Sequence, residues 1–430
     1  MPSVTLNLLD ELYLNLDREA EPWTIHCELR VSTHIDPDRL LTAVGAAAAR
    51  HPLARARLAN WRFQDRSYDW EIAQELDEVP LKIVACGDEE ALALEREQLF
   101  STSPSLATPP PFGMLVARCG EGDTLMLNLH HAAGDAIGAA RLMLSIMRAY
   151  AGEPDPVPAL DPLAVHDVRE LAAARSDAEL AARSRALLAG AWRPLQNTVR
   201  VAREGANGRA AYGFELFALS ADETGRVFAS RPRGATVNDV LLGALAVAIC
   251  RWNEDHGQRG EPIALSMPVN LRPAEWRFEV FSNFAAWVTV WVRPKSGEGL
   301  SSVVERVAAV TNQIKRDRLG GIAVDLLRIP GGLMIAAKRW LPYLKTLTGD
   351  VVVDTASLSN LGTIDALPPP FDGPGTAVWF SPPSQMPLGV AIGALTLGNR
   401  LHVAMRYRHA QFDRAAGRRF TERYRAALLS

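Results

Sequence analysis

Two adjacent histidines and a nearby aspartate form the pattern in this sequence that is most specific for chemistry. His130 and His131 end an alternating, strand-like segment that includes Leu125, and Asp135 follows a short Ala-Ala-Gly turn. Neighbouring residues on a strand point to opposite sides of the sheet. The two imidazole rings should therefore diverge, which disfavours a metal ion held by both. Asp135 stands at the start of the next helix, where the helix dipole stabilises a negative charge.

A histidine at the end of a strand is suited to general base catalysis, because a pKa of about 6.5 leaves much of the imidazole neutral at pH 7. One ring would face a cavity, while the other would pack or form hydrogen bonds. The sequence lacks the nucleophile elbow Gly-x-Ser-x-Gly, a phosphate loop ending in Gly-Lys-Ser/Thr, and the zinc motif His-Glu-x-x-His. The alternative interpretation is structural, with two ordinary histidines at a strand end and a helix-capping Asp135.

The composition excludes several classes of protein. The chain has 430 residues, 48% of them hydrophobic and 22% charged, and its formal net charge is -3. These values are typical of a globular protein, and they provide no global basic field for nucleic acid. The cysteines are far apart and form no C-x-x-C pair, which favours buried free thiols over a disulfide framework or a structural metal. They are Cys27, Cys86, Cys119 and Cys250.

Neither a membrane span nor a signal peptide is predicted. The longest apolar run, residues 240–250, is shorter than the roughly 20 residues that cross a bilayer. The N-terminal residues lack the basic start and the long apolar stretch of a secretory signal. We therefore expect a cytoplasmic protein, and we expect it to be a monomer.

The elements that must position the motif form a first group of strands and helices. The strand that precedes His130 is predicted to be the second strand of a β-hairpin, and Asp135 to open the following helix. A Pro-rich segment at 152–162 is the best candidate for a linker. The expected elements are a strand at 24–33, a helix at 36–50, hairpin strands at 113–119 and 124–131, and a helix at 135–150.

A second group of mixed elements follows the linker. We expect strands at 211–219, 262–269, 284–292, 351–359, 377–380, 388–397 and 401–408, and helices at 165–188, 236–253, 300–318, 322–344 and 413–429, with a short helix after Ser220. The pattern predicts an α+β protein with two lobes, 1–160 carrying the motif and 191–430, joined by a linker and crossover helix at 161–190. A cleft between two such lobes is a natural substrate site.

The motif His130-His131-x-x-x-Asp135 in a chain of this length resembles the chloramphenicol-acetyltransferase-like superfamily. That superfamily includes nonribosomal peptide condensation domains, plant-type BAHD acyltransferases, wax ester synthases and polyketide-associated acyltransferases. The motif specifies only three positions, and the order of further segments strengthens the resemblance. Two features depart from it: Ala136 stands where the superfamily commonly has Gly, and the absence of DFGWG argues against the BAHD branch. The supporting segments are 40–55, 236–242, 266–273, 281–284 and 357–362.

The resemblance implies a fold and a reaction. The fold would be two chloramphenicol-acetyltransferase-like lobes, each a mixed β-sheet flanked by helices, with a tunnel between them. The reaction would be acyl transfer from a thioester, on coenzyme A or on the phosphopantetheine arm of a carrier protein, to an alcohol or an amine. Donor and acceptor would enter the tunnel from opposite faces. No permanently bound cofactor and no metal are implied.

The resemblance also assigns roles to motif residues. His131 would be the general base, which takes the proton of the acceptor and returns a proton to the leaving thiol. His130 and Asp135 would support the motif structurally, with Asp135 held by an arginine. Arg272 is the first choice for this partner, and Arg55 is the second.

Four further residues are candidates for contacts with the substrate or with the oxyanion that develops during acyl transfer. The charge on the tetrahedral intermediate requires a hydrogen-bond donor. Each candidate also has a structural interpretation. They are Gly134, Asn283, Ser357 and Asn360.

The expected function is O-acyl transfer in lipid or natural-product biosynthesis. Two alternatives stay open: a stand-alone condensation enzyme that forms an amide from a carrier-bound acyl group, and a catalytically silent scaffold that binds partner proteins. The segment 322–344 carries several basic residues and Trp340. It would be either an amphipathic surface helix that touches a membrane or a carrier protein, or a half-buried helix with a basic outer face.

Overall fold

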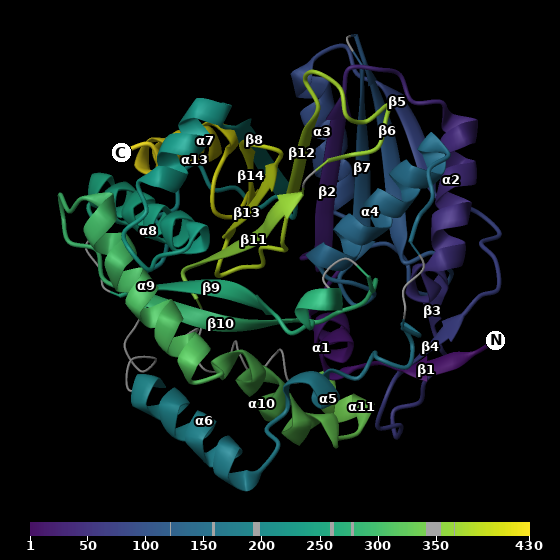
Figure 1. Cartoon of the computed structure of the whole chain (residues 1–430), viewed down its shortest axis with the longest axis horizontal. Helices are drawn as coiled ribbons and strands as arrows, with labels where there is room; N and C mark the ends of the chain where they lie inside the picture. The colour runs from purple at the N-terminus through teal and green to yellow at the C-terminus, as the bar shows by residue number, and fades with distance from the viewer. Residues whose placement is uncertain are drawn as a thin grey trace.

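Two β-sheets, each covered by helices, divide the molecule into the two lobes seen in Figure 1. Both lobes mix helices with parallel and antiparallel strands, so the fold is α+β, as the sequence predicted. The structure is a computed structural model. It describes residues 1–120, 122–156, 160–191, 198–258, 262–276, 279–340, 354–364 and 366–430.

The five-stranded sheet of the first lobe carries the motif on its central strand. Its strand order is β12-β2-β7-β6-β5, and only β5 and β6 run parallel. A three-stranded sheet of order β1-β4-β3 and helix α1 complete this part. The elements are β1 (Ser3–Thr5), α1 (Leu8–Leu16), β2 (Thr24–Val31), α2 (Pro37–Arg50), β3 (Ala56–Leu58), β4 (Asp69–Ile72), β5 (Leu81–Ala85), α3 (Glu89–Phe100), β6 (Phe112–Cys119), β7 (Gly122–His130), α4 (Ala136–Ala151) and β12 (Ala377–Ser381).

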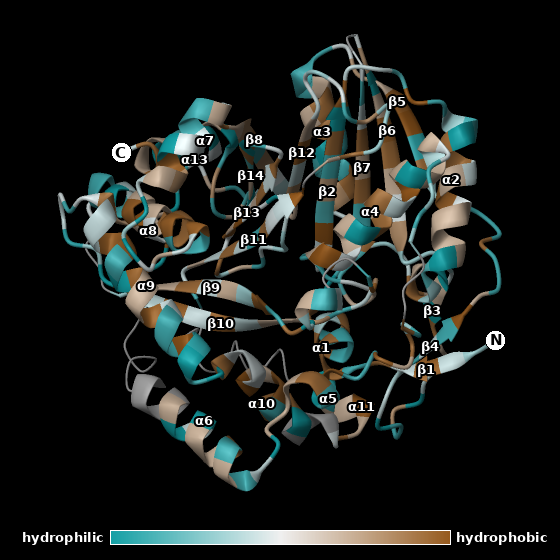
Figure 2. Cartoon of the chain, viewed as in Figure 1, coloured by the Kyte–Doolittle hydropathy of each residue, from teal (hydrophilic) through white to brown (hydrophobic). Residues whose placement is uncertain are grey.

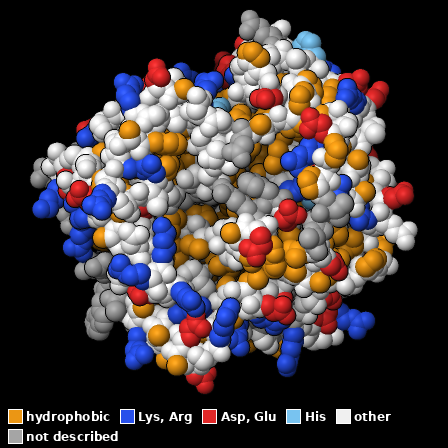
Figure 3. Space-filling model, viewed as in Figure 1, with side chains coloured by type: hydrophobic (Ala, Val, Ile, Leu, Met, Phe, Trp, Pro, Cys, Tyr) orange, Lys and Arg blue, Asp and Glu red, His pale blue; other side chains and the backbone are white. Residues whose placement is uncertain are grey.

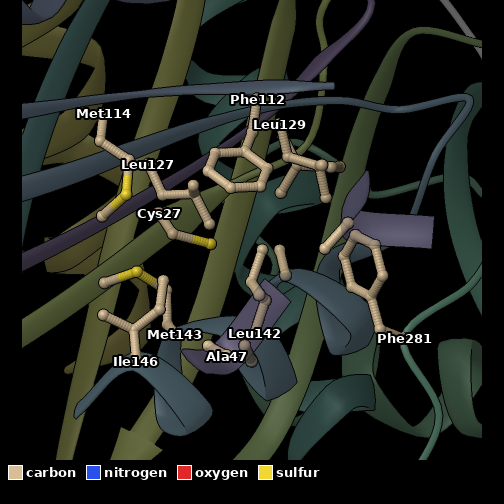
Figure 4. Close-up of a cluster of buried hydrophobic side chains, with 14 of the residues drawn as sticks. Cys27, Ala47, Phe112, Met114, Leu127, Leu129, Leu142, Met143, Ile146 and Phe281 are labelled. Atoms are coloured by element: carbon tan, nitrogen blue, oxygen red, sulfur yellow. The ribbon is translucent and has the colours of Figure 1, made fainter. Parts of the chain in front are cut away.

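The alternation of β7 determines which way its residues point. Leu129 packs with Leu142 and Ile146 of α4 in one core, shown in Figure 4. Met126 lies in a different cluster, with Phe100 of α3. Burying a side chain of this size is worth about 1.5–3 kcal/mol. A slip of one residue would exchange the two faces, so the register that aims the motif is strongly specified.

The second lobe contains a six-stranded sheet of order β10-β9-β11-β13-β14-β8. Helix α8 is buried along most of its length in the same core as residues of α9 and α13. Figure 2 shows hydrophobic residues concentrated on the strands and the inner helix faces. The elements are β8 (Tyr212–Ala218), α7 (Ala221–Ala229), α8 (Val237–Asp255), β9 (Ile263–Asn270), β10 (Ala285–Val292), α9 (Leu300–Arg316), β11 (Ala356–Ile364), β13 (Val390–Leu397), β14 (Arg400–Arg408) and α13 (Arg414–Leu428).

One strand crosses from the second part of the chain into the first sheet. The expected boundary assigned everything after residue 191 to the second lobe, but β12 pairs antiparallel with β2, with Phe380 opposite Cys27. For this strand the expectation was wrong. An unpaired edge at β2 would expose a row of backbone donors and acceptors, and β12 covers it. Strand pairing across such a distance in sequence leaves no local signal.

Two of the expected helices are each divided into two shorter helices. The single helix expected at 165–188 is two helices, α5 (Val168–Ala172) and α6 (Asp177–Ala191). The helix expected at 322–344 is α10 (Ile322–Gly331) and α11 (Ile335–Lys338), and residues 341–344 lie outside the described residues, as do 351–353 of an expected strand and 157–159 of the expected linker. None of the described helices combines the length and the apolar character that a membrane crossing requires.

Candidate active site

The motif loop lies where β7 ends, and residues of two other segments hold its backbone. The N–H of His131 donates to the carbonyl of Trp23 at 3.0 Å. The side-chain amide of Asn283 donates to the carbonyls of His131 and Ala132, at 2.6 and 2.9 Å. Asn283 comes just before β10 of the second lobe, so the loop is fixed from both lobes.

The ring of His131 is packed among aromatic side chains. Its centroid lies 3.9 Å from that of Tyr13 and 6.5 Å from that of Trp23. Its Nδ1 atom is buried and has no hydrogen-bond partner among the described residues. Burial lowers the pKa of His131 to about 4, against opposing effects of its own backbone, Asp135 and Asn283. The ring is therefore neutral near pH 7, the form in which an imidazole can accept a proton.

His130 makes its own contacts, which differ from those of His131. Its Nδ1 accepts from the N–H of Ala132 at 3.1 Å, which leaves the proton on Nε2, and Nε2 lies 3.6 Å from Asp17. Burial raises the pKa of Asp17, but hydrogen bonds from His130, Ser103 and the backbone of Trp23 outweigh burial and leave the pKa below its ordinary value. His130 is thus part of a buried structural contact. The described residues contain no group of three His, Cys, Asp or Glu side chains placed to hold a metal ion.

Arg272, rather than Arg55, pairs with Asp135. The guanidinium of Arg272 contacts both carboxylate oxygens, at 2.7 and 2.9 Å. Asp135 also accepts from the N–H groups of Gly138 at 2.8 Å and Phe284 at 2.9 Å. Burial raises the pKa of Asp135, but the charge and hydrogen bonds of Arg272 outweigh burial and lower it. Arg55 instead donates to backbone carbonyls of the first lobe, so the second-choice partner was wrong.

The ion pair connects the two lobes directly behind the motif. Arg272 follows β9 and also donates to the carbonyl of Ser282 at 2.9 Å, while its guanidinium lies 4.7 Å from the ring centroid of Phe284. Asp135 caps α4 through its bond to Gly138. A Cβ on Gly138 would lie 3.1 Å from the carbonyl oxygen of Ser282. Gly138 therefore permits a close approach of the two lobes behind the motif.

Sequence reasoning missed a buried polar network beneath the motif loop. Asp10 of α1 accepts from the amide of Asn283 at 3.0 Å and lies 2.7 Å from Nε2 of His166. The other ring nitrogen of His166 lies 2.7 Å from the hydroxyl of Ser282. The only local signal was the capping box of Asn7 and Asp10 at the start of α1. A capping box predicts a helix and says nothing of contacts with the second lobe.

The remaining candidates are placed as structural residues or lie apart from His131. A Cβ on Gly134 would approach Phe281 and Leu129 to 3.0 and 3.2 Å, so this glycine permits close packing. Asn360 accepts from the N–H of Gly362 at 2.9 Å, at an irregularity in β11. Ser357 of β11 has a buried hydroxyl without a partner among the described residues. Within that part of the chain no hydrogen bond joins Ser357 or Asn360 to His131. The amide of Asn283 is engaged by backbone carbonyls and is not free for an oxyanion.

Two cavities are lined by residues that lie close in sequence to the motif or to its partner Arg272. One of about 620 Å³ is bordered by Leu271, next to Arg272, and another of about 460 Å³ by Asn128, two residues before His130. Figure 3 shows the surface hollowed where the lobes meet, with hydrophobic side chains at its base. His131 lines neither cavity, so the tunnel expected past its ring stays a prediction.

Comparison with known proteins agrees with the geometry. Residues 13–321 match the family model described as "Condensation domain". An uncharacterised protein of Mycobacterium tuberculosis, recorded in strains CDC 1551 / Oshkosh and H37Rv, is 36% identical over 438 aligned residues, which cover 100% of this chain and 99% of the relative.

Solved structures share the fold at low sequence identity. The first condensation domain of the CDA synthetase has a TM-score of 0.69 and 16% identity, covering 100% of this chain and 95% of that one. The epimerization domain of the third module of tyrocidine synthetase B has a TM-score of 0.67 and 16% identity, with 100% and 95% covered. The SgcC5 protein from Streptomyces globisporus has a TM-score of 0.65 and 17% identity, with 98% and 97% covered.

Proposed function

The chain belongs to the condensation-domain family of transferases, and we propose that it moves an acyl group from a thioester donor to a hydroxyl acceptor with His131 as general base. The observation that carries the proposal is the state of the His131 ring. It is neutral and sits on a loop fixed from both lobes. A group held in one orientation before the reaction loses little entropy when it acts.

In the proposed reaction, His131 takes up one proton and later returns it. Nδ1 is buried, so we assign Nε2 to proton transfer. It takes the proton of the acceptor hydroxyl as the oxygen attacks the thioester carbonyl. The tetrahedral intermediate collapses with cleavage of the C–S bond, and the imidazolium returns the proton to the thiolate. The buried carboxylate of Asp135 favours the transient positive charge, since it raises the pKa of His131.

A hydroxyl acceptor is favoured over an amine by one comparison. The SgcC5 structure is a complex with (R)-(-)-1-(2-naphthyl)-1,2-ethanediol, a compound with two hydroxyl groups. Amide formation stays the second candidate, because other similar structures are domains of peptide synthetases. A silent scaffold is disfavoured, because His131 and the pair of Asp135 and Arg272 are all in place. The donor would be acyl-CoA or an acyl carrier protein.

Replacement of His131 tests the proposal. Mass spectrometry after incubation with acyl-CoA and acyl-carrier donors and mixed alcohol and amine acceptors would identify the product. We expect His131→Ala to lower the rate of transfer about 10²–10⁴-fold, the usual worth of a general base, with little change in Tm. His256→Gln, in the second lobe at the C-terminal end of α8, is the control. Full activity of His131→Ala would exclude the mechanism, and amide products alone would exclude O-acyl transfer.

A further inference from the structure

Exposed hydrophobic side chains gather around helix α11, and the mechanism above does not use them. Phe63 and Trp340 are the most exposed aromatic side chains in the described part of the chain, at 69% and 70%. Leu333 and Met334, which come just before α11, are also exposed. We call these four side chains the apolar patch. Hydrophobic groups that collect on a surface in this way are typical of a site that contacts a partner or a membrane.

Backbone and ring contacts hold the loop that carries Phe63 against α11. The N–H of Ala336 donates to the carbonyl of Phe63 at 3.3 Å. The ring centroid of Phe63 lies 5.7 Å from that of Trp61, and the guanidinium of Arg339 lies 5.2 Å from the same Trp61 ring. The loop and α11 therefore form one continuous surface, although they are about 270 residues apart in the chain.

The charge around the apolar patch is positive. In the segments 61–67 and 332–340 every exposed charged side chain is an arginine. The acid of the loop, Asp65, is half-buried and accepts from the N–H of Arg62 at 2.6 Å. Among the described residues no ion pair neutralises these arginines, although the whole chain has a net charge of -3. They are Arg62, Arg66 and Arg339.

Buried side chains fix this surface to the body of the molecule. Ile335 is fully buried in the core of the first lobe. The ammonium of buried Lys338 lies 2.7 Å from Glu11 of α1 and donates to the carbonyl of Arg66 at 2.6 Å. Figure 1 shows α11 at the lower edge of the molecule, close to α1. Because both segments are held in this way, the apolar patch keeps one arrangement.

The shape of the surface favours a lipid bilayer over a protein partner. The apolar patch lines neither the cavity of about 620 Å³ nor that of about 460 Å³. Its side chains stand on a loop and on both ends of a short helix. Proteins bind one another mainly through side chains that fill well-packed pockets. Exposed aromatic and aliphatic side chains beside basic residues are instead what enters the headgroup region of a membrane.

We propose that this surface binds an anionic lipid bilayer. The apolar patch enters the boundary between headgroups and acyl chains, and the three arginines lie at the level of the lipid phosphates, where basic side chains are attracted. The bound bilayer lies on the side of α1. Tyr13 of that helix follows Glu11 by two residues, and its ring centroid lies 3.9 Å from that of His131. One helix thus connects the membrane contact with the motif loop.

Sedimentation with lipid vesicles tests the proposal without any need for transfer activity. We expect the wild type to bind vesicles of phosphatidylcholine and phosphatidylglycerol more tightly than vesicles of phosphatidylcholine alone. Binding should weaken as salt is added, because salt screens the arginines. Absence of binding to the anionic vesicles would overturn the proposal. Failure of the proposed acyl transfer would leave this measurement valid.

Two sets of substitutions separate the apolar and the charged contributions. Phe63→Ser with Trp340→Ser should weaken binding to the anionic vesicles at least tenfold, and so should Arg62→Gln with Arg66→Gln and Arg339→Gln. The apolar control is Ile83→Ser with Leu94→Ser, two exposed hydrophobic residues elsewhere. The charge control is Arg226→Gln with Arg233→Gln and Arg316→Gln, exposed residues of the second lobe. Equal losses in the controls and the test variants would contradict a specific surface.

Fluorescence quenching by brominated lipids tests insertion directly. The difference in emission between the wild type and Trp340→Phe isolates the signal of Trp340. We expect anionic vesicles with brominated acyl chains to quench this difference signal, and unchanged emission would exclude insertion. If the wild type binds an acyl carrier protein but no vesicles, and Phe63→Ser with Trp340→Ser abolishes that binding, the surface serves a protein and the lipid proposal is wrong.

Discussion

At the scale of single residues, the environment of His131 decides the pH range in which it can act. Burial moves its pKa to about 4, well below the usual value of about 6.5. The neutral form, in which the ring would act as the proposed base, predominates at every pH above the pKa. The low pKa makes the ring a weaker base in the free protein, and fixed orientation is what compensates for that loss.

The pH profile of transfer should reflect this shift. We expect kcat/KM with a thioester donor to be independent of His131 ionisation above about pH 5 and to fall about tenfold per pH unit below the pKa. Initial rates across the pH range, with circular dichroism at each pH to confirm folding, provide the measurement. An inflection near the unperturbed value, about 6.5, would mean that the ring is solvated before the reaction.

The Asp135–Arg272 ion pair should contribute strongly to the free energy of unfolding. Asp135→Asn leaves Arg272 buried without a counter-charge, which typically costs about 3–5 kcal/mol. Urea unfolding should show this loss, whereas Asp77→Asn at an exposed position should not. Because folding lowers the pKa of Asp135, its stabilisation is complete above the unfolded value of about 3.9 and is lost as pH falls through the folded one. Equal stability of Asp135→Asn and wild type would contradict this account.

At the scale of elements, a glycine allows β12 of the first sheet to lie against β13 of the second sheet. A Cβ on Gly393 of β13 would lie 2.0 Å from the carbonyl oxygen of Phe380 in β12. Phe380 is at the same time paired with Cys27 of β2, so the close approach lies where the two sheets meet. A side chain at residue 393 cannot be accommodated unless the backbone of β12 moves.

Gly393→Ala should therefore destabilise the fold through strain. We expect a loss of about 1–3 kcal/mol, the range for overpacked sites, measured by urea unfolding. The control is Gly45→Ala in α2, where an added Cβ meets nothing within 4 Å and the helix gains about 0.5–1 kcal/mol. A Gly393→Ala variant as stable as the wild type would show that β12 and β13 are further apart than the structure places them.

At the scale of the whole molecule, three connections make the lobes depend on one another. They are the β12–β2 pairing, the Asp135–Arg272 ion pair, and the bonds of Asn283 to the motif loop. Each connection joins residues that are buried. Separation of the lobes would expose backbone donors, charges and hydrophobic surface together, which makes an intermediate with one folded lobe unfavourable.

Unfolding should accordingly be cooperative across both lobes. Trp70 is buried in the first lobe and Trp252 in the second. Because the chain contains ten tryptophans, the difference in fluorescence between the wild type and a variant in which one of these two residues is replaced by Phe would isolate the signal of that residue and of its lobe. We expect both signals, and circular dichroism, to change at the same urea concentration. Transitions at two concentrations would mean that the lobes fold independently and that the connections are weak.

Much of the local structure follows from the sequence because its causes are local. Alternation predicted the strand that ends at His130, directly before His131, and the capping residue Asp135 marked the start of α4. The divergence of His130 and His131 that the period of a strand predicts stays a prediction. The resemblance to acyltransferases needed only these residues and the order of a few segments. The choice between donor carriers and between hydroxyl and amine acceptors is outside what such patterns determine.

Tertiary structure decided the rest, because it depends on residues that are distant in the chain. Arg272 rather than Arg55 faces Asp135 because β9 of the second lobe ends beside α4. The pKa of His131 is low because Tyr13 and Trp23 cover its ring. The hydrophobic periodicity of the sequence does not predict such contacts. The sequence by itself determined which residue could act as the base and where its strand ends; only the packing of the two lobes determined its partners and its protonation.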